Sequence, residues 1–358
     1  MRIIHCVASL SSGGAERQLS YLAPLMAKIG MDVHVAFLTK GPMPPSTKQM
    51  LNVKLHQILH KSNYDPLIVW RFFLLFKALK PDIVHTWIPT IDVMAGTAAI
   101  IGQHKWIIRE PTSHEAHTGW KAWLRQKLAL KANYIIANSI GGKKYWENIA
   151  PSLPCTVIYN GLPENVFAEE STIVKQQRFR NPKIIFAGRL IKPKNIFLLL
   201  NAVRALQKKL QFQLIVCGTG ILEQQVKNYI NQHGLQNRVV LLGHVDQKRL
   251  LKLLRESALL VSPSFYEGCP NVVLEAMANM CPLAVSNIPA HKDILNEDVA
   301  FFFEPHDQQA LERTLEFAIN YPETAWKKAL KARLLAENFA INKTVNSYIT
   351  VYKNMVTS

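Results

Sequence analysis

The chain contains 358 residues, of which 49% are hydrophobic and 19% charged, a composition that suits two folded domains and excludes a disordered chain. Its 42 lysines and arginines outnumber 25 acidic residues, and the net charge of +17 favours an acidic partner: a nucleotide diphosphate, an anionic membrane surface or nucleic acid. The sequence has no RNA-binding aromatic signature, zinc finger or basic region joined to heptads, so we do not expect nucleic acid as the partner.

The first predicted elements are a buried strand over Arg2–Leu10, a glycine-containing loop and a helix over Ala15–Ile29. The helix has apolar residues at helical spacing and a glycine beyond its end. Gly13 and Gly14 in the loop would let a ligand approach the backbone at the helix N-terminus, although such a pair serves any tight turn equally well. Further strand-like runs alternate with helical segments, which predicts a parallel α/β sheet. These runs are Asp32–Leu38, the segment from Pro81, Trp106–Ile108 and Tyr134–Ala137.

A polar segment follows the predicted strand Trp106–Ile108 and should lie at the carboxyl end of the sheet. It contains Glu110 and His114. Either side chain could orient a substrate or handle a proton in a reaction. Both could instead be ordinary polar residues of a loop, and the sequence leaves this choice open.

Two helical segments of the first half raise the question of a membrane surface. Leu67–Leu79 is apolar on nearly all sides, which favours a buried helix over one that lies on a membrane. Trp120–Lys131 is a basic amphipathic helix with two tryptophans, and it could rest on anionic lipid or be a solvated surface helix. Its basic side chains are Lys121, Arg125, Lys127 and Lys131.

We expect the first domain to end after Val157–Gly161 and to span residues 1–170. Residues 171–181 have no strand or helix pattern and are interpreted as a linker. The second domain, 182–335, repeats the alternation of strands and helices, and 336–358 is a final helical segment. Gly218-Thr-Gly220 follows a strand but has no third glycine, so NAD binding is not predicted.

Two stretches of the second half carry charged residues at the ends of predicted strands. The predicted strand Lys183–Leu190 ends in Gly188-Arg189 and is followed by a helix from about Ile196. Arg189 and Lys194 therefore lie where ligands bind in open α/β sheets, and both could contact phosphate oxygens. After Ala258–Val261, Glu267 lies on a loop and Glu275 in the second turn of a helix that begins near Asn271. A helix N-terminus favours an anion, and carboxylates accept hydrogen bonds from neighbouring hydroxyls. The pattern therefore suits a sugar nucleotide, although surface acids and lysines would look the same.

These stretches, about eighty residues apart, resemble the C-terminal half of the GT-B glycosyltransferases of family 4. The resemblance rests on Gly188-Arg189-Leu190, Lys194-Asn195, Glu267-Gly-Cys-Pro-Asn and Leu274-Glu275-Ala-Met. It implies a retaining, metal-independent enzyme that uses a nucleotide-sugar. It also implies an α/β fold of two doubly wound Rossmann-like domains facing a cleft. The first domain would bind the acceptor and the second the donor, and the last helix would cross back to the N-terminal domain.

The resemblance also implies roles for individual residues. Arg189 and Lys194 would stabilise the departing diphosphate, Glu267 would bind the donor sugar and Glu275 the ribose. Further donor contacts would come from Gly13, Gly14, Gly218, His244, Val245, Gly268, Cys269, Pro270, Asn271 and Val272. We expect no metal and no cofactor, because the sequence contains no Asp-x-Asp. Departures such as Met280, Cys269 and the Ile288–His291 turn affect the expected shape of the donor-sugar site.

We therefore expect transfer of a hexose or N-acetylhexosamine, with UDP as the expected nucleotide, to a glycan or polyprenyl-linked acceptor. Bacterial relatives with this glycine-rich start often build surface polysaccharide or lipopolysaccharide. The alternatives are a nucleotide-sugar epimerase, a phosphorylase, or a membrane- or polyanion-binding protein without activity. Five scattered cysteines without a C-x-x-C pair, and no apolar run of about 18 residues, favour the cytoplasm, with peripheral contact to the inner membrane face.

Overall fold

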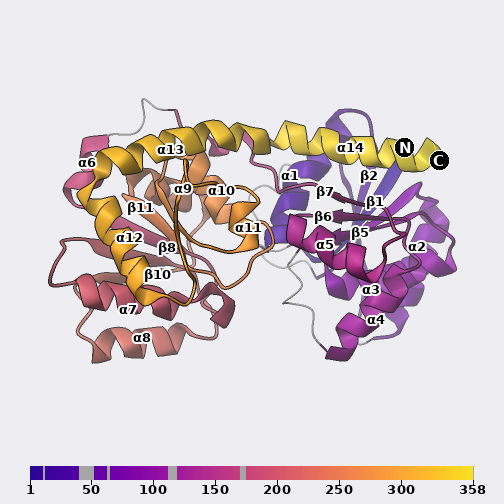
Figure 1. Ribbon diagram of the computed structural model, residues 1–358. Helices are drawn as coiled ribbons and strands as arrows, with labels where there is room; N and C mark the ends of the chain where they lie inside the picture. The colour runs from indigo at the N-terminus through magenta and orange to yellow at the C-terminus, as the bar shows by residue number, and fades with distance from the viewer. Residues whose placement is uncertain (11–12, 40–51, 63–64, 112–118, 170–174, 358) are drawn as a thin grey trace. The chain divides into compact units, whose positions relative to one another are not determined.

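The computed structural model describes residues 1–10, 13–39, 52–62, 65–111, 119–169 and 175–357. The chain divides into two compact units, each built around its own parallel β-sheet (Figure 1). Unit 1 comprises Met1–Gly161 together with Ile341–Ser358, and unit 2 comprises Leu162–Ala340. The two sheets with their flanking helices confirm the predicted pair of α/β domains.

The described residues of unit 1 form one sheet of seven parallel strands in the order β3-β2-β1-β4-β5-β6-β7. They are β1 (Arg2–Ser9), β2 (Asp32–Thr39), β3 (Lys54–Gln57), β4 (Ile83–Thr86), β5 (Trp106–Glu110), β6 (Tyr134–Ala137) and β7 (Cys155–Val157). Its helices are α1 (Gly14–Lys28), α2 (Leu67–Leu79), α3 (Pro89–Ile101), α4 (Gly119–Ala129), α5 (Ile140–Ile149) and α14 (Ile341–Thr357). Alternate residues of β1 serve the two faces of the sheet, because successive side chains of a strand point in opposite directions. Ile3 and Val7 join a core with α1 and α14, whereas Ile4 and Cys6 join a core with α2 and α3.

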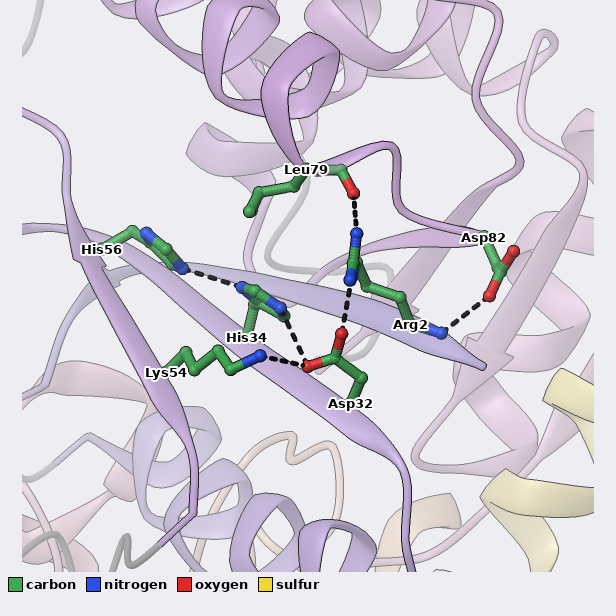
Figure 2. A network of polar contacts seen from close by, with 7 residues as sticks. All are labelled: Arg2, Asp32, His34, Lys54, His56, Leu79 and Asp82. Carbon is green, nitrogen blue, oxygen red and sulfur yellow. Dashed lines mark hydrogen bonds and ion pairs between the residues drawn. The ribbon is translucent and has the colours of Figure 1, made fainter.

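A polar network links strands β1, β2 and β3 of unit 1 near their amino-terminal ends (Figure 2). Asp32 accepts hydrogen bonds from Lys54 Nζ at 2.8 Å and from Arg2 Nε at 2.6 Å, and these two bonds hold the pKa of its carboxyl below the usual range. His34 Nε2 lies 3.1 Å from Asp32 Oδ1, and its Nδ1 lies 2.8 Å from His56 Nε2. Ligands bind at the carboxyl ends of the strands in such folds, and this network lies at the opposite, amino-terminal end. We therefore interpret it as structural.

In the part of unit 2 that the structure describes, six parallel strands form a sheet in the order β10-β9-β8-β11-β12-β13. They are β8 (Lys183–Ala187), β9 (Gln213–Cys217), β10 (Val239–Gly243), β11 (Leu259–Ser262), β12 (Leu283–Ser286) and β13 (Phe301–Phe303). The helices are α6 (Lys175–Arg180), α7 (Ile196–Leu206), α8 (Glu223–Gln232), α9 (Gln247–Glu256), α10 (Asn271–Ala278), α11 (Pro289–Lys292), α12 (Gln308–Asn320) and α13 (Pro322–Ala336). Short 3-10 turns cover Glu164–Val166, Lys192–Lys194 and Glu337–Phe339. The apolar strands read as nearly continuous hydrophobic runs, as expected for a parallel sheet covered on both faces.

The predicted linker differs from the structure, because part of it is helix α6 packed onto unit 2. Arg178 of this helix is buried and its guanidinium donates to the backbone carbonyls of Arg255, at 3.0 Å from Nε, and Met280. The carbonyl of Arg255 is among the last of α9, which lack partners within the helix, and Met280 follows the carboxyl end of α10. The guanidinium also lies 5.5 Å from the ring of Trp326. The polar segment that was interpreted as a linker thus contains a buried arginine, Arg178, that attaches it to unit 2.

The boundary of the first unit lies at Gly161 rather than near residue 170. Residues beyond Gly161 bind the carboxyl end of α10: Ala168 N donates to Ala278 O at 3.0 Å, and Asn279 Nδ2 donates to Val166 O at 2.9 Å. These bonds make the segment part of unit 2. Sequence patterns do not show them, because the partners are more than 100 residues apart.

The chain passes between the units twice, at Gly161–Leu162 and at Ala340–Ile341. The two passages run side by side, since Leu162 N donates to Phe339 O at 2.7 Å. Gln18 of α1 binds the first passage with both ends of its amide, accepting from Gly161 N at 2.8 Å and donating to Gly161 O at 3.1 Å. After the second passage, α14 begins at Ile341 rather than at the predicted residue 336, and its side chains fill the core of unit 1.

Candidate active site

The candidate site of unit 2 lies where the strand order changes direction. Strands β8 and β11 are neighbours in the sheet. From β8 the chain continues to β9 on one side, and from β11 it continues to β12 on the other side, so the connections that leave their carboxyl ends diverge. Such a switch point is where open α/β sheets bind ligands. Lys194 follows β8 and Glu267 follows β11, and the two side chains form an ion pair. The backbones are also joined there, because Phe265 N donates to Pro193 O at 2.8 Å.

Glu267 is an anionic carboxylate at neutral pH. Burial alone would raise its pKa, but the nearby charge of Lys194 and hydrogen bonds from Lys194 and Ser264 outweigh burial and lower it. The Ser264 bond runs from Oγ to Oε1 at 2.7 Å. The side chain remains 12% exposed, so the carboxylate can also meet a ligand from solvent.

Glu275 lies on α10, which begins at Asn271 directly after Pro270. The loop of Gly268, Cys269 and Pro270 therefore leads into this helix, and Asn271 and Val272 are its first two residues, as the sequence predicts. Glu275 itself is only 2% exposed, and its Oε1 accepts from Gln247 Nε2 at 3.3 Å. Gln247 opens α9, so this contact joins the turn after β10 to α10.

The two glycines of the loop after β9 are required by its close packing against the loop after β8. Gly218 has φ +136°, and a Cβ there would lie 1.9 Å from Gly188 O. A Cβ on Gly220 would lie 2.4 Å from Leu190 O. The loops are also linked by a hydrogen bond from Leu190 N to Thr219 O at 2.9 Å. Gly218 and Gly220 therefore allow the two loops to pack together at the site. This packing explains both glycines without a ligand.

The remaining residues that we predicted as donor contacts make no described bond to the Lys194–Glu267 pair. Arg189 is exposed directly after β8, and His244 is exposed and Val245 half-buried directly after β10. Gly13 caps the N-terminus of α1 in unit 1, and Gly14 is the first residue of that helix. Each of these positions lies after the carboxyl end of a strand.

Glu110 lies in the core of unit 1 and not at an accessible end of the sheet, where we expected it. It is completely buried, and its Oε2 accepts from Arg125 at 2.7 Å and from Trp146 Nε1 at 2.9 Å. Arg125 also binds Asp92 at 2.6 Å. A role in proton transfer is therefore not supported for Glu110, whose charge balances a buried arginine. His114, the other candidate of this segment, lies outside the described residues.

Because of these contacts, the basic face that we predicted for α4 does not include Arg125. Arg125 is 1% exposed and belongs to the core, whereas Lys121 and Lys127 are exposed. The guanidinium lies 5.1 Å from the ring of Trp146, and its two carboxylate partners keep its pKa above the usual range against the effect of burial. Lys131 follows the helix and is exposed.

Ser264 and His291 are site residues that the sequence did not single out. His291 was noted only as part of an unusual turn, yet it is completely buried beside the loop that carries Glu267. The described part of the chain contains no group of three or more histidine, cysteine or acidic side chains placed to hold a metal ion. Within the same residues, no helix combines the length and apolar character needed to cross a membrane.

Comparison with known proteins gives a consistent picture. The profile described as "Glycosyl transferases group 1" matches residues 169–333, and that described as "Glycosyltransferase Family 4" matches residues 12–166. A similar protein from Campylobacter jejuni is named GalNAc-alpha-(1->4)-GalNAc-alpha-(1->3)-diNAcBac-PP-undecaprenol alpha-1,4-N-acetyl-D-galactosaminyltransferase. It is 27% identical over 343 residues, which cover 89% of each chain. An uncharacterized glycosyltransferase of Haemophilus influenzae is 26% identical over 94% of this chain and 96% of its own.

The fold matches solved structures along nearly the whole chain. HepE of Anabaena, in complex with UDP and glucose, superposes with a TM-score of 0.84 at 20% identity, covering 99% of this chain and 100% of its own. The lipopolysaccharide outer core galactosyltransferase WaaB superposes with a TM-score of 0.75 at 18% identity, covering 100% and 99%. At this level of identity the likeness shows a common fold.

Proposed function

Because the chain belongs to the group 1 glycosyl transferases of family 4, we propose that it moves a hexose or N-acetylhexosamine from a UDP-sugar to a lipid-linked glycan. We further propose that transfer retains the anomeric configuration and needs no metal ion. The observation that carries the proposal is the pairing of Lys194 with Glu267 at the switch point of unit 2. UDP in the HepE structure and the undecaprenol-linked substrate in the name of the Campylobacter relative support the choice of donor and acceptor.

Breaking a sugar–phosphate bond requires stabilisation of the charge on the departing diphosphate. Lys194, Arg189 and the N-terminus of α10 would supply fixed positive potential where this charge develops. Glu267 would accept hydrogen bonds from hydroxyls of the donor sugar, and Glu275 from the ribose. With the leaving phosphate next to the incoming hydroxyl, attack on the same face of the sugar would retain the configuration.

The first test follows nucleotide release from single UDP- and GDP-sugars in the presence of EDTA, with and without a lipid extract from the source cells. We expect release from a UDP-sugar that the lipid extract stimulates and EDTA does not reduce. Loss of release in EDTA would contradict metal independence. Failure to release nucleotide, together with no binding of UDP or GDP by calorimetry, would favour a binding protein without transferase activity.

The Glu275→Ala variant should bind UDP about 1–3 kcal/mol more weakly than the parent protein, because a charged hydrogen-bond acceptor is lost. Calorimetric titration with UDP measures the change. Glu275→Gln, which keeps the side-chain volume, separates a loss of binding from a loss of packing around this buried position. Glu256→Ala, at the exposed end of α9, is the matched control. Equal UDP affinity in the Glu275 variants would exclude the ribose contact.

We also propose that unit 1 contacts an anionic membrane surface, where a lipid-linked acceptor would be found. Exposed tryptophans occur on α2 and α4, with Trp70 55%, Trp120 67% and Trp123 58% exposed. Both helices pack against α3 on the same face of the sheet, and neither contains an acidic residue. α2 is apolar on both sides: it buries Phe72 and Phe76 and exposes other apolar residues, namely Leu67, Trp70 and Leu74. Exposed tryptophans among lysines suit the headgroup region of a bilayer.

Replacing Lys121 and Lys127 together by glutamine should weaken binding to phosphatidylglycerol vesicles about 30-fold, since each lysine near an anionic surface contributes about 1 kcal/mol. Vesicle co-sedimentation at fixed salt measures this. Replacing the exposed Lys208 and Lys209 of unit 2 by glutamine makes the same change in net charge and should have a much smaller effect. An equal loss in both variants would show that only the overall charge matters.

A further inference from the structure

The loop that carries Glu267 rests on a buried polar chain that begins at His291. This histidine lies on the short helix α11, after β12, and is completely buried. Its ring reaches the last residues of two neighbouring strands, Ser262 of β11 and Ser286 of β12. It therefore bridges the carboxyl ends of these strands directly behind the candidate site.

The protonation state of His291 follows from its partners. Nδ1 lies 2.8 Å from the carbonyl oxygen of Ser286, which can only accept, so Nδ1 carries the hydrogen. Burial lowers the pKa of the ring to about 4, so at neutral pH Nε2 has no hydrogen and accepts from Ser262 Oγ at 3.2 Å. One neutral tautomer satisfies both nitrogens.

From this ring two more hydrogen bonds lead to Glu267. Ser286 Oγ donates to the carbonyl of Ser264 at 2.6 Å, and Ser264 Oγ donates to Glu267 Oε1 at 2.7 Å. Ser264 is 1% exposed and Ser286 is fully buried, so water does not compete with these bonds. The direction of each bond is determined, because each carbonyl and the carboxylate can only accept.

We propose that His291 is a positioning residue for Glu267, fixing the carboxylate through Ser286 and Ser264 so that it meets the hydroxyls of the donor sugar. The inference rests on the proposed role of Glu267. His291 does not touch the substrate. Lys194 pairs with the same carboxylate oxygen, Oε1, so this oxygen is held from two sides and the geometry of the carboxylate is over-determined. A catalytic group held in this way costs little reorganisation during the reaction.

A double-mutant cycle tests the proposal. His291→Ala and Ser264→Ala should each lower kcat about tenfold, as expected for loss of a hydrogen bond that supports a charged group. The affinity for UDP should not change, because Glu267 is proposed to bind the sugar and not the nucleotide. In a Glu267→Gln background either change should have less than about a twofold further effect, since residues acting through one group are not additive. The same tenfold loss in both backgrounds would overturn the proposal.

Two further variants separate positioning from simple loss of packing. His291→Asn can still donate to Ser286 O and should recover part of the kcat lost in His291→Ala; no recovery would count against the proposal. Ser257→Ala removes another buried hydroxyl of unit 2, one that donates to Leu253 O at 2.7 Å, and should leave kcat unchanged. A kcat loss in Ser257→Ala as large as that in Ser264→Ala would show a general packing effect and overturn the proposal. If Glu267→Gln alone leaves kcat unchanged, the proposed function of Glu267 fails and the inference fails with it.

Discussion

Replacing Arg125 with methionine should lower the free energy of unfolding by about 3–5 kcal/mol, the usual cost of removing one partner from a buried ion pair. The guanidinium is the cation that both Asp92 and Glu110 contact, at 2.6 and 2.7 Å, in the core of unit 1. Even with Arg125 in place, burial raises the pKa of Asp92 to about 6. Without it, two carboxylates would face each other in an apolar environment.

Denaturant unfolding followed by tryptophan fluorescence measures this loss, because six of the seven tryptophans lie in unit 1. Lys127→Met on the same helix is the matched control and should change stability by less than about 0.5 kcal/mol. The deficit of the Arg125 variant should grow as pH rises. A carboxyl whose pKa is raised by folding stabilises below its unfolded pKa and loses this contribution as pH rises through its folded pKa. A small, pH-independent loss would contradict the buried charge cluster.

Replacing Lys194 with methionine should reduce turnover about 10²–10³-fold, the usual effect of removing one group that stabilises charge in the transition state. Lys194 lies at the switch point and is paired with Glu267, so the variant loses a positive charge beside the diphosphate and leaves the carboxylate less well held. Steady-state kinetics with the UDP-sugar found in the release assay measures the change. Lys192→Met, an exposed lysine of the same 3-10 turn, should retain activity within a few-fold.

The pH profile of the Lys194 variant provides a second measurement. Burial favours the neutral form of Glu267, and Lys194 is the main influence that lowers its pKa. Without Lys194 this pKa should rise, and the acidic limb of kcat/KM should move to higher pH because the reaction uses the anion. A variant that loses stability in proportion to its activity, with an unshifted acidic limb, would assign Lys194 a structural role.

The sequence predicted the fold and the motif loops because their signals are local. Buried parallel strands are short apolar runs. Arg189, Lys194 and Glu267 follow such runs within a few residues, and Glu275 lies on the helix that begins after the second run. The short strands β3 and β7 were not predicted, because three or four residues of mixed character have no clear period.

The errors concern side chains whose partners are distant in sequence. In the sequence Arg125 looks like one more basic residue of α4, beside its exposed lysines. Only its ion pairs with Asp92 and Glu110 show that it is buried. Arg178 lies in a polar segment, but its acceptors are 77 and 102 residues away. His291 belongs to a four-residue helix, so no periodicity points to it, and its effect depends on strands that the sheet brings together. In each case the sequence shows the charge or polarity of the side chain but not its burial.

The placement of α14 determines the order in which the protein can be completed during synthesis. Unit 2 is continuous, so its core can close as soon as residue 340 has left the ribosome. Unit 1 needs Val345, Tyr348, Tyr352 and Met355 of α14 for its core, and these residues are synthesised after all of unit 2. The usual N-terminal-first order of domain folding is therefore reversed for completion of the native core. Until α14 arrives, the face of the sheet beside α1 stays open, and a nascent chain would expose it to chaperones.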